Sequence, residues 1–241
     1  FALSIYMDDG SATAFSAAWL EIVVLGLLAW LPNRNRKEEL TPRDGFVVVL
    51  LFWLVFGIIG AFPFLLAPHH QLPLVDALFE SFSGLTGTGS SVIADVDNIP
   101  ASLNYYRHQL CWLGGMGIVV LAVAVLPMLG VGGMQLYKAE SPGVVKDKLT
   151  PRITQTAKAL WLIYVGMTLA CLLAFRLAGM SWLDAVCHSF STIATAGFST
   201  HGSSIGHFNS PLIEMITVFF MFAGAINFGL HFMALRRGRF I

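Results

Sequence analysis

Long apolar runs alternate with short polar segments along this chain, and the lengths of the runs predict most of its architecture. Four runs contain no charged residue, at 46–66, 110–136, 159–175 and 215–235. A fifth, at 12–31, is interrupted only by Glu21. A helix needs about 20 apolar residues to cross the hydrocarbon core of a bilayer, and about 17 to 25 are observed. The pattern therefore predicts an all-α integral membrane protein with five spanning helices.

Two further apolar segments are too short to span. They are LVDALFESFSGL at 74–85 and WLDAVCHSFSTI at 182–193. A helix of that length reaches about 18 Å, whereas the bilayer core is roughly 30 Å thick. Each segment is therefore either a surface helix or a re-entrant one. After a re-entrant helix the chain returns through non-helical backbone, which is tolerated in a membrane only where it is buried in protein or lines a watery cavity.

The two short segments belong to an internal repeat with an offset of 108 residues. Residues 75–91 and 183–199 are identical at seven of 17 positions. Each copy has the same order of spanning run, short helix, loop of small residues and spanning run. This order is typical of ion-channel pore units. We therefore predict a preceding transmembrane helix and cytoplasmic link at 1–40, a first pore repeat at 41–140 and a second at 141–241.

The loop after each short helix offers oxygen atoms to a cation. The C-terminal end of a helix is the negative end of its dipole, and glycine allows successive carbonyls to face one axis. Rings of such oxygens replace the water shell of a potassium ion. We predict two strands of a potassium selectivity filter, Thr86, Gly87, Thr88, Gly89 and Ala194, Thr195, Ala196, Gly197. The alternative is a flexible loop that binds nothing.

The closing glycines of the two loops, Gly89 and Gly197, are retained while their neighbours differ. We expect both to adopt a backbone conformation that a Cβ atom disfavours. Glu80 and His188 occupy equivalent positions on the short helices, where they either tune the filter electrostatically or form hydrogen bonds behind it.

The basic residues predict the orientation. Twelve of the 14 Lys and Arg residues lie in the segments 34–43, 138–158 and 236–239, which the positive-inside rule places in the cytoplasm. Only 12% of the residues are charged, against roughly a quarter in a soluble domain. The three cysteines lie in apolar segments, and we expect them to pack as small hydrophobic residues without forming disulfides.

Several stretches resemble one known family. They are FESFSGLTGTGSS, GGMGIVVLAVAVLPMLGVGGMQLYKAESPG, LWLIY, HSFSTIATAGFSTHGSSIGHF and NFGLHF. The chain resembles the membrane subunit of bacterial Trk-type potassium-uptake systems, in the Trk/Ktr/HKT superfamily. The resemblance implies a pseudo-tetrameric pore in which one chain carries four pore units, each giving one filter strand. Two units are present here, so the chain resembles the N-terminal half of that fold with one preceding helix.

The resemblance also implies the function. It implies uptake of potassium, the transported ion, across the bacterial inner (cytoplasmic) membrane, with no organic cofactor and no nucleic acid. The partners it implies are a second copy in a homodimer, a cytosolic ring of nucleotide-binding regulatory subunits, the C-terminal pore repeats and the lipid bilayer. Channel-like and proton-coupled transport both remain open. Family filters are rich in threonine, so Gly87, Ala194 and Ala196 reduce the expected discrimination against sodium.

Two other functions are weighed against ion transport. An intramembrane hydrolase needs a nucleophile and a base, and Ser199 with His201 offers such a pair. The corresponding part of the first repeat has no histidine, and a catalytic pair does not require a duplicated scaffold. A purely structural membrane module is the other alternative. We expect neither, and we expect no enzyme activity.

Overall fold

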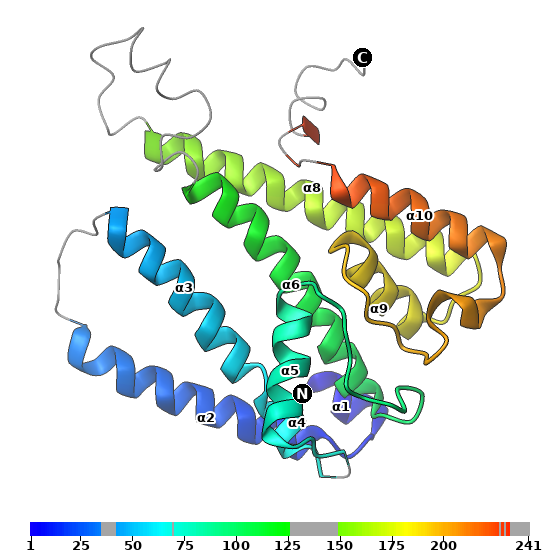
Figure 1. Ribbon diagram of the computed structural model, residues 1–241, viewed down its shortest axis with the longest axis horizontal. Coiled ribbons are helices and arrows are strands. Elements are labelled where there is room, and N and C mark those ends of the chain that lie inside the picture. The colour runs from blue at the N-terminus through cyan, green and yellow to red at the C-terminus, as the bar shows by residue number, and fades with distance from the viewer. Residues whose placement is uncertain (35–41, 69, 126–148, 227, 229, 232–241) are drawn as a thin grey trace, which may run out of the picture.

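The computed structural model describes the chain except residues 35–41, 69, 126–148, 227, 229 and 232–241. The described part contains helices and loops but no strand, which confirms the predicted all-α fold (Figure 1). Its elements are α1 (Ala2–Met7), α2 (Ala12–Trp30), η1 (Leu31–Asn33), α3 (Pro42–Ile59), α4 (Phe62–Leu66), α5 (Leu74–Leu85), α6 (Ala101–Val125), α8 (Leu149–Leu177), α9 (Trp182–Ile193), η3 (Ser204–Phe208) and α10 (Pro211–Ala225).

Three helical stretches in the described residues are long and apolar enough to cross a membrane. They are Ala12–Asn33, Val49–Leu66 and Lys158–Leu177, and they coincide with three of the five predicted runs. The run at 110–136 begins in α6 and continues beyond Val125, outside the described residues. Large apolar side chains such as Leu28 and Leu162 are exposed on these helices, as expected of surfaces that contact lipid.

The run predicted as one helix over 46–66 is interrupted. Helix α3 ends at Ile59, and α4 begins at Phe62 with Pro63 in its first turn, where the missing N–H of proline has no partner to lose. The hydroxyl of Tyr106 donates to the carbonyl oxygen of Gly60 at 3.0 Å. The break frees the carbonyl oxygen of Gly60 from the helix, and Tyr106 of α6 supplies its hydrogen bond. This contact with another helix stabilises the break.

The run predicted over 215–235 is not one continuous helix in the described residues, and positions 227, 229 and 232–235 of it lie outside them. Helix α10 starts earlier, at Pro211, and ends at Ala225, because Ile226 has extended backbone with φ −69° and ψ 138°. Just before the break, Gly224 lies against the last residue of α9. A Cβ atom on Gly224 would lie 2.7 Å from the carbonyl oxygen of Ile193. The end of α10 therefore meets the end of α9 at a point where only glycine fits.

The two short helices occupy the predicted segments: α5 covers 74–85 and α9 covers 182–193. Helix α6 lies between them and packs against both, and also against α8 (Figure 1). A Cβ atom on Gly114 of α6 would collide with the carbonyl oxygen of Leu85, and one on Gly115 would lie 3.0 Å from Ala194 Cβ. These glycines therefore allow α6 to approach the ends of both short helices closely.

Each repeat has its own apolar core. In the first, Phe64, Leu103 and Leu110 pack around Ala61 and Ala77. The core of the second contains Tyr164, Cys171, Phe175, Met180, Ala185, Ile193 and Ile213. All three cysteines are free and fully buried, as predicted. The repeats are therefore separate packing units that meet along α6.

The N-terminal segment is tied to α6 through Asp9. Its carboxylate accepts hydrogen bonds from the backbone N–H of Ser102, at 2.8 Å, and from the hydroxyl of Ser4, at 2.5 Å. Burial alone would raise the pKa of Asp9, but the hydrogen bonds from Ser102, Ser4 and Ser11 outweigh it and lower the pKa below its usual value. A carboxylate at this end of α6 satisfies a free N–H group and opposes the positive end of the helix dipole.

Candidate ion-binding site

The loops after α5 and α9 leave their helices in the same way. The N–H of Thr86 donates to the carbonyl oxygen of Phe82 at 2.9 Å, and the N–H of Ala194 donates to that of Phe190 at 3.1 Å. One residue further on, the N–H groups of Gly87 and Thr195 donate to the carbonyl three residues before each. These residues are related by the 108-residue offset, so the repeat extends to the backbone of both loops.

Backbone conformation tests the expectation about the glycines. Gly89 has φ +70°, as predicted, and Gly87 has φ +71°. Gly197 is not among the residues with positive φ, so the expectation is wrong there. In the second loop the left-handed residue is Thr195, with φ +52°, at the position equivalent to Gly87. A residue with a Cβ atom costs about 1–2 kcal/mol in this conformation, which marks Thr195 as a strained position.

The two loops touch at their closing glycines. A Cβ atom on Gly89 would collide with the backbone nitrogen of Gly197, and one on Gly197 would lie 3.3 Å from the carbonyl oxygen of Gly89. One on Gly87 would lie 3.7 Å from the carbonyl oxygen of Ala194. Gly89 and Gly197, 108 positions apart, therefore lie backbone to backbone. Gly89 needs glycine for both its φ angle and the lack of space, whereas Gly197 needs it for the lack of space alone.

Threonine hydroxyls lie along the open side of these loops. Thr86, Thr88 and Thr195 are exposed. The Oγ1 atom of Thr86 donates to the carbonyl oxygen of Phe82 at 2.8 Å and lies 2.9 Å from Oγ1 of Thr88. The Oγ1 atom of Thr195 donates to the carbonyl oxygen of Ala194 at 2.8 Å. These hydroxyl oxygens keep free lone pairs that can accept a cation.

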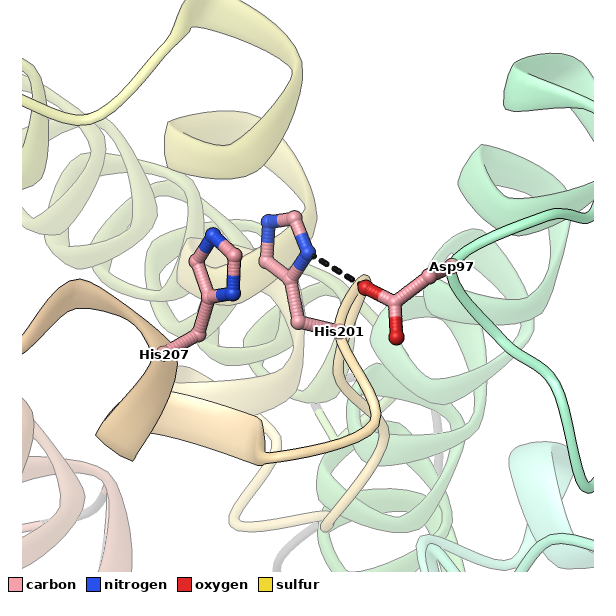
Figure 2. A group of neighbouring side chains, drawn as sticks. All are labelled: Asp97, His201 and His207. Carbon is pink, nitrogen blue, oxygen red and sulfur yellow. Dashed lines mark hydrogen bonds and ion pairs between the residues drawn. The ribbon is translucent and has the colours of Figure 1, made fainter.

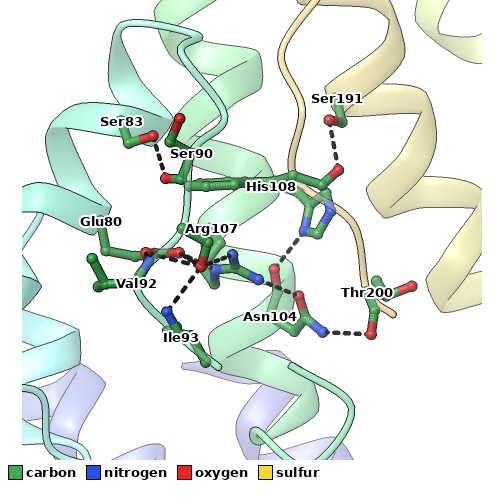
Figure 3. Close-up of polar contacts among 12 residues, drawn as sticks. Glu80, Ser83, Ser90, Val92, Ile93, Asn104, Arg107, His108, Ser191 and Thr200 are labelled. Atoms are coloured by element: carbon green, nitrogen blue, oxygen red, sulfur yellow. Dashed lines mark hydrogen bonds and ion pairs between the residues drawn. The ribbon is translucent and has the colours of Figure 1, made fainter. Parts of the chain in front are cut away.

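A serine from each short helix holds its loop from behind. The hydroxyl of Ser83 donates to the carbonyl oxygen of Ser90 at 2.5 Å, and that of Ser191 donates to Phe198 at 2.8 Å (Figure 3). The two serines are equivalent in the repeat, and both are buried. Their conservation between the copies is therefore explained by one shared task, which is to anchor the loop just after its closing glycine.

Glu80 and His188 also form hydrogen bonds behind the loops. The hydroxyl of Ser91 donates to the Glu80 carboxylate at 3.0 Å, and the Nε2 atom of His188 lies 3.0 Å from the hydroxyl oxygen of Ser199. The serines are again equivalent in the repeat. The hydroxyl of Ser199 therefore contacts the ring of His188, whereas His201 contacts it through its backbone N–H, at 3.1 Å.

Sequence reasoning missed the residue that joins the two repeats, Arg107. It lies on α6 and is only 1% exposed. Its Nε atom donates to Glu80 at 2.6 Å, its guanidinium also donates to Ser91 at 3.0 Å, and it lies 4.3 Å from the ring centroid of Phe198 in the second loop (Figure 3). Arg107 is one of two basic residues outside the cytoplasmic clusters. Its place three residues before the apolar run at 110–136 was the available signal, because a charge beside a membrane span is costly unless it is paired.

A polar network continues from Arg107 toward the second repeat. The guanidinium donates to the side-chain oxygen of Asn104 at 3.3 Å, and the amide of Asn104 donates to the carbonyl oxygen of Thr200, also at 3.3 Å. His108 Nδ1 lies 2.8 Å from the carbonyl oxygen of Asn104. The pair of Arg107 and Glu80 is formally neutral, so it orders both loops without adding net charge beside them.

Comparison with known proteins places these features in context. The family described as "TrkH: Cation transport protein" matches residues 11–240. The chain is 54% identical over 231 residues to the Trk system potassium uptake protein TrkH of Vibrio parahaemolyticus, a match that covers 95% of this chain and 48% of that protein. It is 42% identical over 236 residues to the Trk system potassium uptake protein TrkG of Escherichia coli K12, which covers 98% and 49%.

A solved structure matches as well. The crystal structure of the potassium transporter TrkH from Vibrio parahaemolyticus superposes with a TM-score of 0.87 at 48% sequence identity, covering 98% of this chain and 47% of that one. The chain therefore spans about half the length of the relatives it matches.

Proposed function

The chain belongs to the TrkH family of cation transport proteins, and from this premise we propose that it supplies two of the filter strands through which potassium enters a bacterial cell. One observation carries the proposal: two equivalent loops, each at the C-terminal end of a short helix, meet backbone to backbone at Gly89 and Gly197. The family is one of transport proteins, which sets the hydrolase alternative aside.

In this proposal the eight residues at 86–89 and 194–197 contact the ion. Carbonyl and threonine oxygens replace its water, and the negative ends of α5 and α9 favour a cation beside them. Ser83, Ser191 and the pair of Arg107 and Glu80 hold the two strands in position from behind. The few hydroxyl groups in the second strand weaken the preference for potassium over sodium.

We further propose that the pore is completed by two more units. The chain carries two repeats, at 41–140 and 141–241, after a preceding helix at 1–40, and the relatives are about twice as long. Four strands are needed to surround an ion in a pseudo-tetrameric filter. The remaining units are supplied by a C-terminal half of the same kind.

The assembly that we propose lies in the bacterial inner membrane. It is a homodimer with a cytosolic ring of nucleotide-binding regulatory subunits. The relatives are named as potassium uptake proteins of a Trk system, which supports the presence of partners. The basic segment at 138–158 is the proposed docking surface for the ring, and most of it lies outside the described residues.

Co-expression tests the proposed function. The 241-residue chain expressed alone is expected to give no rubidium uptake, because two strands do not close a filter. Co-expression with the C-terminal half of a relative such as the Vibrio parahaemolyticus protein is expected to restore uptake in a strain deficient in potassium transport. Potassium-selective flux through the 241-residue chain by itself would contradict the four-unit pore.

Labelling of introduced cysteines tests the orientation. Cysteines at Lys37, Lys146 and Arg237 are expected to react only with reagent inside the cell, and one at Ser203 only with reagent outside. The three native cysteines are fully buried and give a low background. Labelling of position 146 from outside would overturn the two-repeat topology.

A further inference from the structure

Three side chains of types that can bind a metal ion lie close together in the loops after the two proposed filter strands. One comes from the first repeat and two come from the second. Asp97 comes from the loop between α5 and α6, His201 from the loop after α9, and His207 from η3 (Figure 2). Their ligand atoms all lie within 4.8 Å of one another. The Nδ1 atom of His201 lies 2.9 Å from Oδ1 of Asp97, although the two residues are 104 positions apart.

The surrounding backbone fixes two of these side chains. The N–H of Gly202 donates to Oδ2 of Asp97 at 3.0 Å, which turns Oδ1 toward the histidine. The N–H of His201 donates to the hydroxyl of Ser199 at 3.1 Å. The Asp97 carboxylate and the His201 ring are therefore held facing each other by their own backbone contacts.

The two histidine rings are stacked in parallel. Their centroids lie 3.5 Å apart with an interplanar angle of 4° (Figure 2). An imidazole binds a metal through a nitrogen lone pair that lies in the plane of the ring. Two stacked rings cannot both direct such a lone pair at one ion, so His207, which is exposed, turns out of the stack when it binds.

The other ring nitrogen of His201 has the environment of a metal-bound histidine. Nε2 is buried and makes no hydrogen bond, yet it lies 3.3 Å from Oδ1 of Asp184. That carboxylate is itself held by a hydrogen bond from the hydroxyl of Thr200 at 2.6 Å. Histidines that ligate metals commonly donate their second N–H to a carboxylate, which fixes the ring and raises its basicity. Nε2 of His201 therefore already faces a carboxylate that Thr200 holds in place.

We propose that Asp97, His201 and His207 bind a divalent transition-metal ion, with Zn²⁺ as the best fit. Two imidazoles and one carboxylate are a common ligand set for zinc, and water takes the fourth position. Magnesium and calcium prefer sites made entirely of oxygen. Ligands 2.0–2.2 Å from a tetrahedral ion lie roughly 3.3–3.6 Å apart, so His201 and Asp97 separate by about half an ångström from their 2.9 Å hydrogen bond. The ligand atom of His207 lies within 4.8 Å of the other two and moves closer when the ring turns.

A metal ion at this position links the two repeats. It joins the loop of the first repeat to that of the second just beyond the filter strands, because His201 lies four residues after Gly197. Ser199, which accepts the hydrogen bond from His201, also contacts His188 behind the second strand. In the orientation given under the proposed function, the site faces the outside of the cell and is exposed to external zinc. Only this exposure rests on the proposed function; the binding of zinc does not.

Calorimetric titration with Zn²⁺ tests the site on the assembled, detergent-purified protein. The unaltered protein is expected to bind one ion per chain at this position. Asp97→Asn and His207→Gln are each expected to weaken binding by at least about tenfold, as losses around metal centres typically do. His70→Gln, which changes a histidine outside the cluster, is the matched control and is expected to bind as the unaltered protein does.

Folding is checked separately from binding. Asp97 and His207 are exposed, so both variants are expected to keep the metal-free melting temperature, while Zn²⁺ raises the melting temperature of the unaltered protein and the control. Co²⁺ is expected to give a visible absorption band that His207→Gln loses. Equal zinc affinity in the unaltered protein and both variants, or no saturable binding at all, overturns the proposal. These readouts do not depend on potassium uptake, so the metal site and the transport function fail or succeed independently.

Discussion

Replacement of Gly89 by alanine is expected to abolish potassium uptake. Gly89 has φ +70°, which costs a residue with a Cβ atom about 1–2 kcal/mol, and that Cβ atom would also collide with the backbone of Gly197. Relief of the collision has to move one of the two strands, so at least one filter oxygen is misaimed. Rubidium and sodium uptake by the assembled protein measures the effect.

The neighbouring glycines separate the contributions of backbone angle and space. Gly197→Ala is expected to reduce potassium uptake and to admit sodium, but both effects are expected to be smaller than in Gly89→Ala. The φ of Gly197 is not positive, and its Cβ atom would lie 3.3 Å from the carbonyl oxygen of Gly89. Gly87→Ala tests the angle alone, since the nearest atom is 3.7 Å away. The matched control is Gly206→Ala, where a Cβ atom meets nothing within 4 Å. Unchanged selectivity in both Gly89→Ala and Gly197→Ala, at normal membrane levels, would falsify the filter assignment.

Removal of either member of the buried ion pair is expected to have the largest effect on stability. Arg107 and Glu80 are joined at 2.6 Å, with side chains that are 1% and 0% exposed. Glu80→Gln or Arg107→Met leaves one buried charge without its partner, which costs about 3–5 kcal/mol in free energy of unfolding. Rubidium uptake is expected to fall as well, because Arg107 contacts the loops of both repeats.

The double variant distinguishes a charge pair from simple packing. Replacement of both residues removes the uncompensated charge, so Glu80→Gln with Arg107→Met is expected to be more stable than the sum of the single changes. Lys158→Met is the control, because Lys158 is exposed and its change is expected to stay within about 0.5 kcal/mol. Unfolding of the purified protein in denaturant measures all four. Strict additivity of the single effects would contradict direct coupling.

Local pattern was sufficient for the two short helices, for three spanning stretches and for the repeat. The bounds of α5 and α9 follow from two apolar segments too short to span, and three spanning stretches follow from uncharged runs of membrane length. The equivalence of Ser83 with Ser191 was visible as an identity in the alignment of the repeats. Each of these features depends on residues close together in the chain, so composition and period determine it.

Tertiary contacts decided the exceptions. The apolar run at 46–66 breaks at Gly60, whose carbonyl is satisfied by Tyr106, and α10 ends at Ala225 after Gly224 packs against α9. Hydropathy does not predict either break, because apolar residues have the same hydropathy inside a helix and just beyond its end. A helix ends where another element forms hydrogen bonds with its free backbone carbonyl groups, or where another element packs so closely that only glycine fits.

The same distinction holds at the candidate site. The sequence by itself determined which loops carry small residues and hydroxyls, and it identified Gly89 as a position that needs glycine. Only the tertiary structure placed Gly197 against Gly89, moved the strained backbone to Thr195, and brought Arg107 to Glu80 and Asp97 to His201. The partners in these contacts come from different helices or different repeats, so they are far apart in the sequence. A buried ion pair or a set of metal ligands forms only when the fold brings such residues together, and no local pattern predicts it.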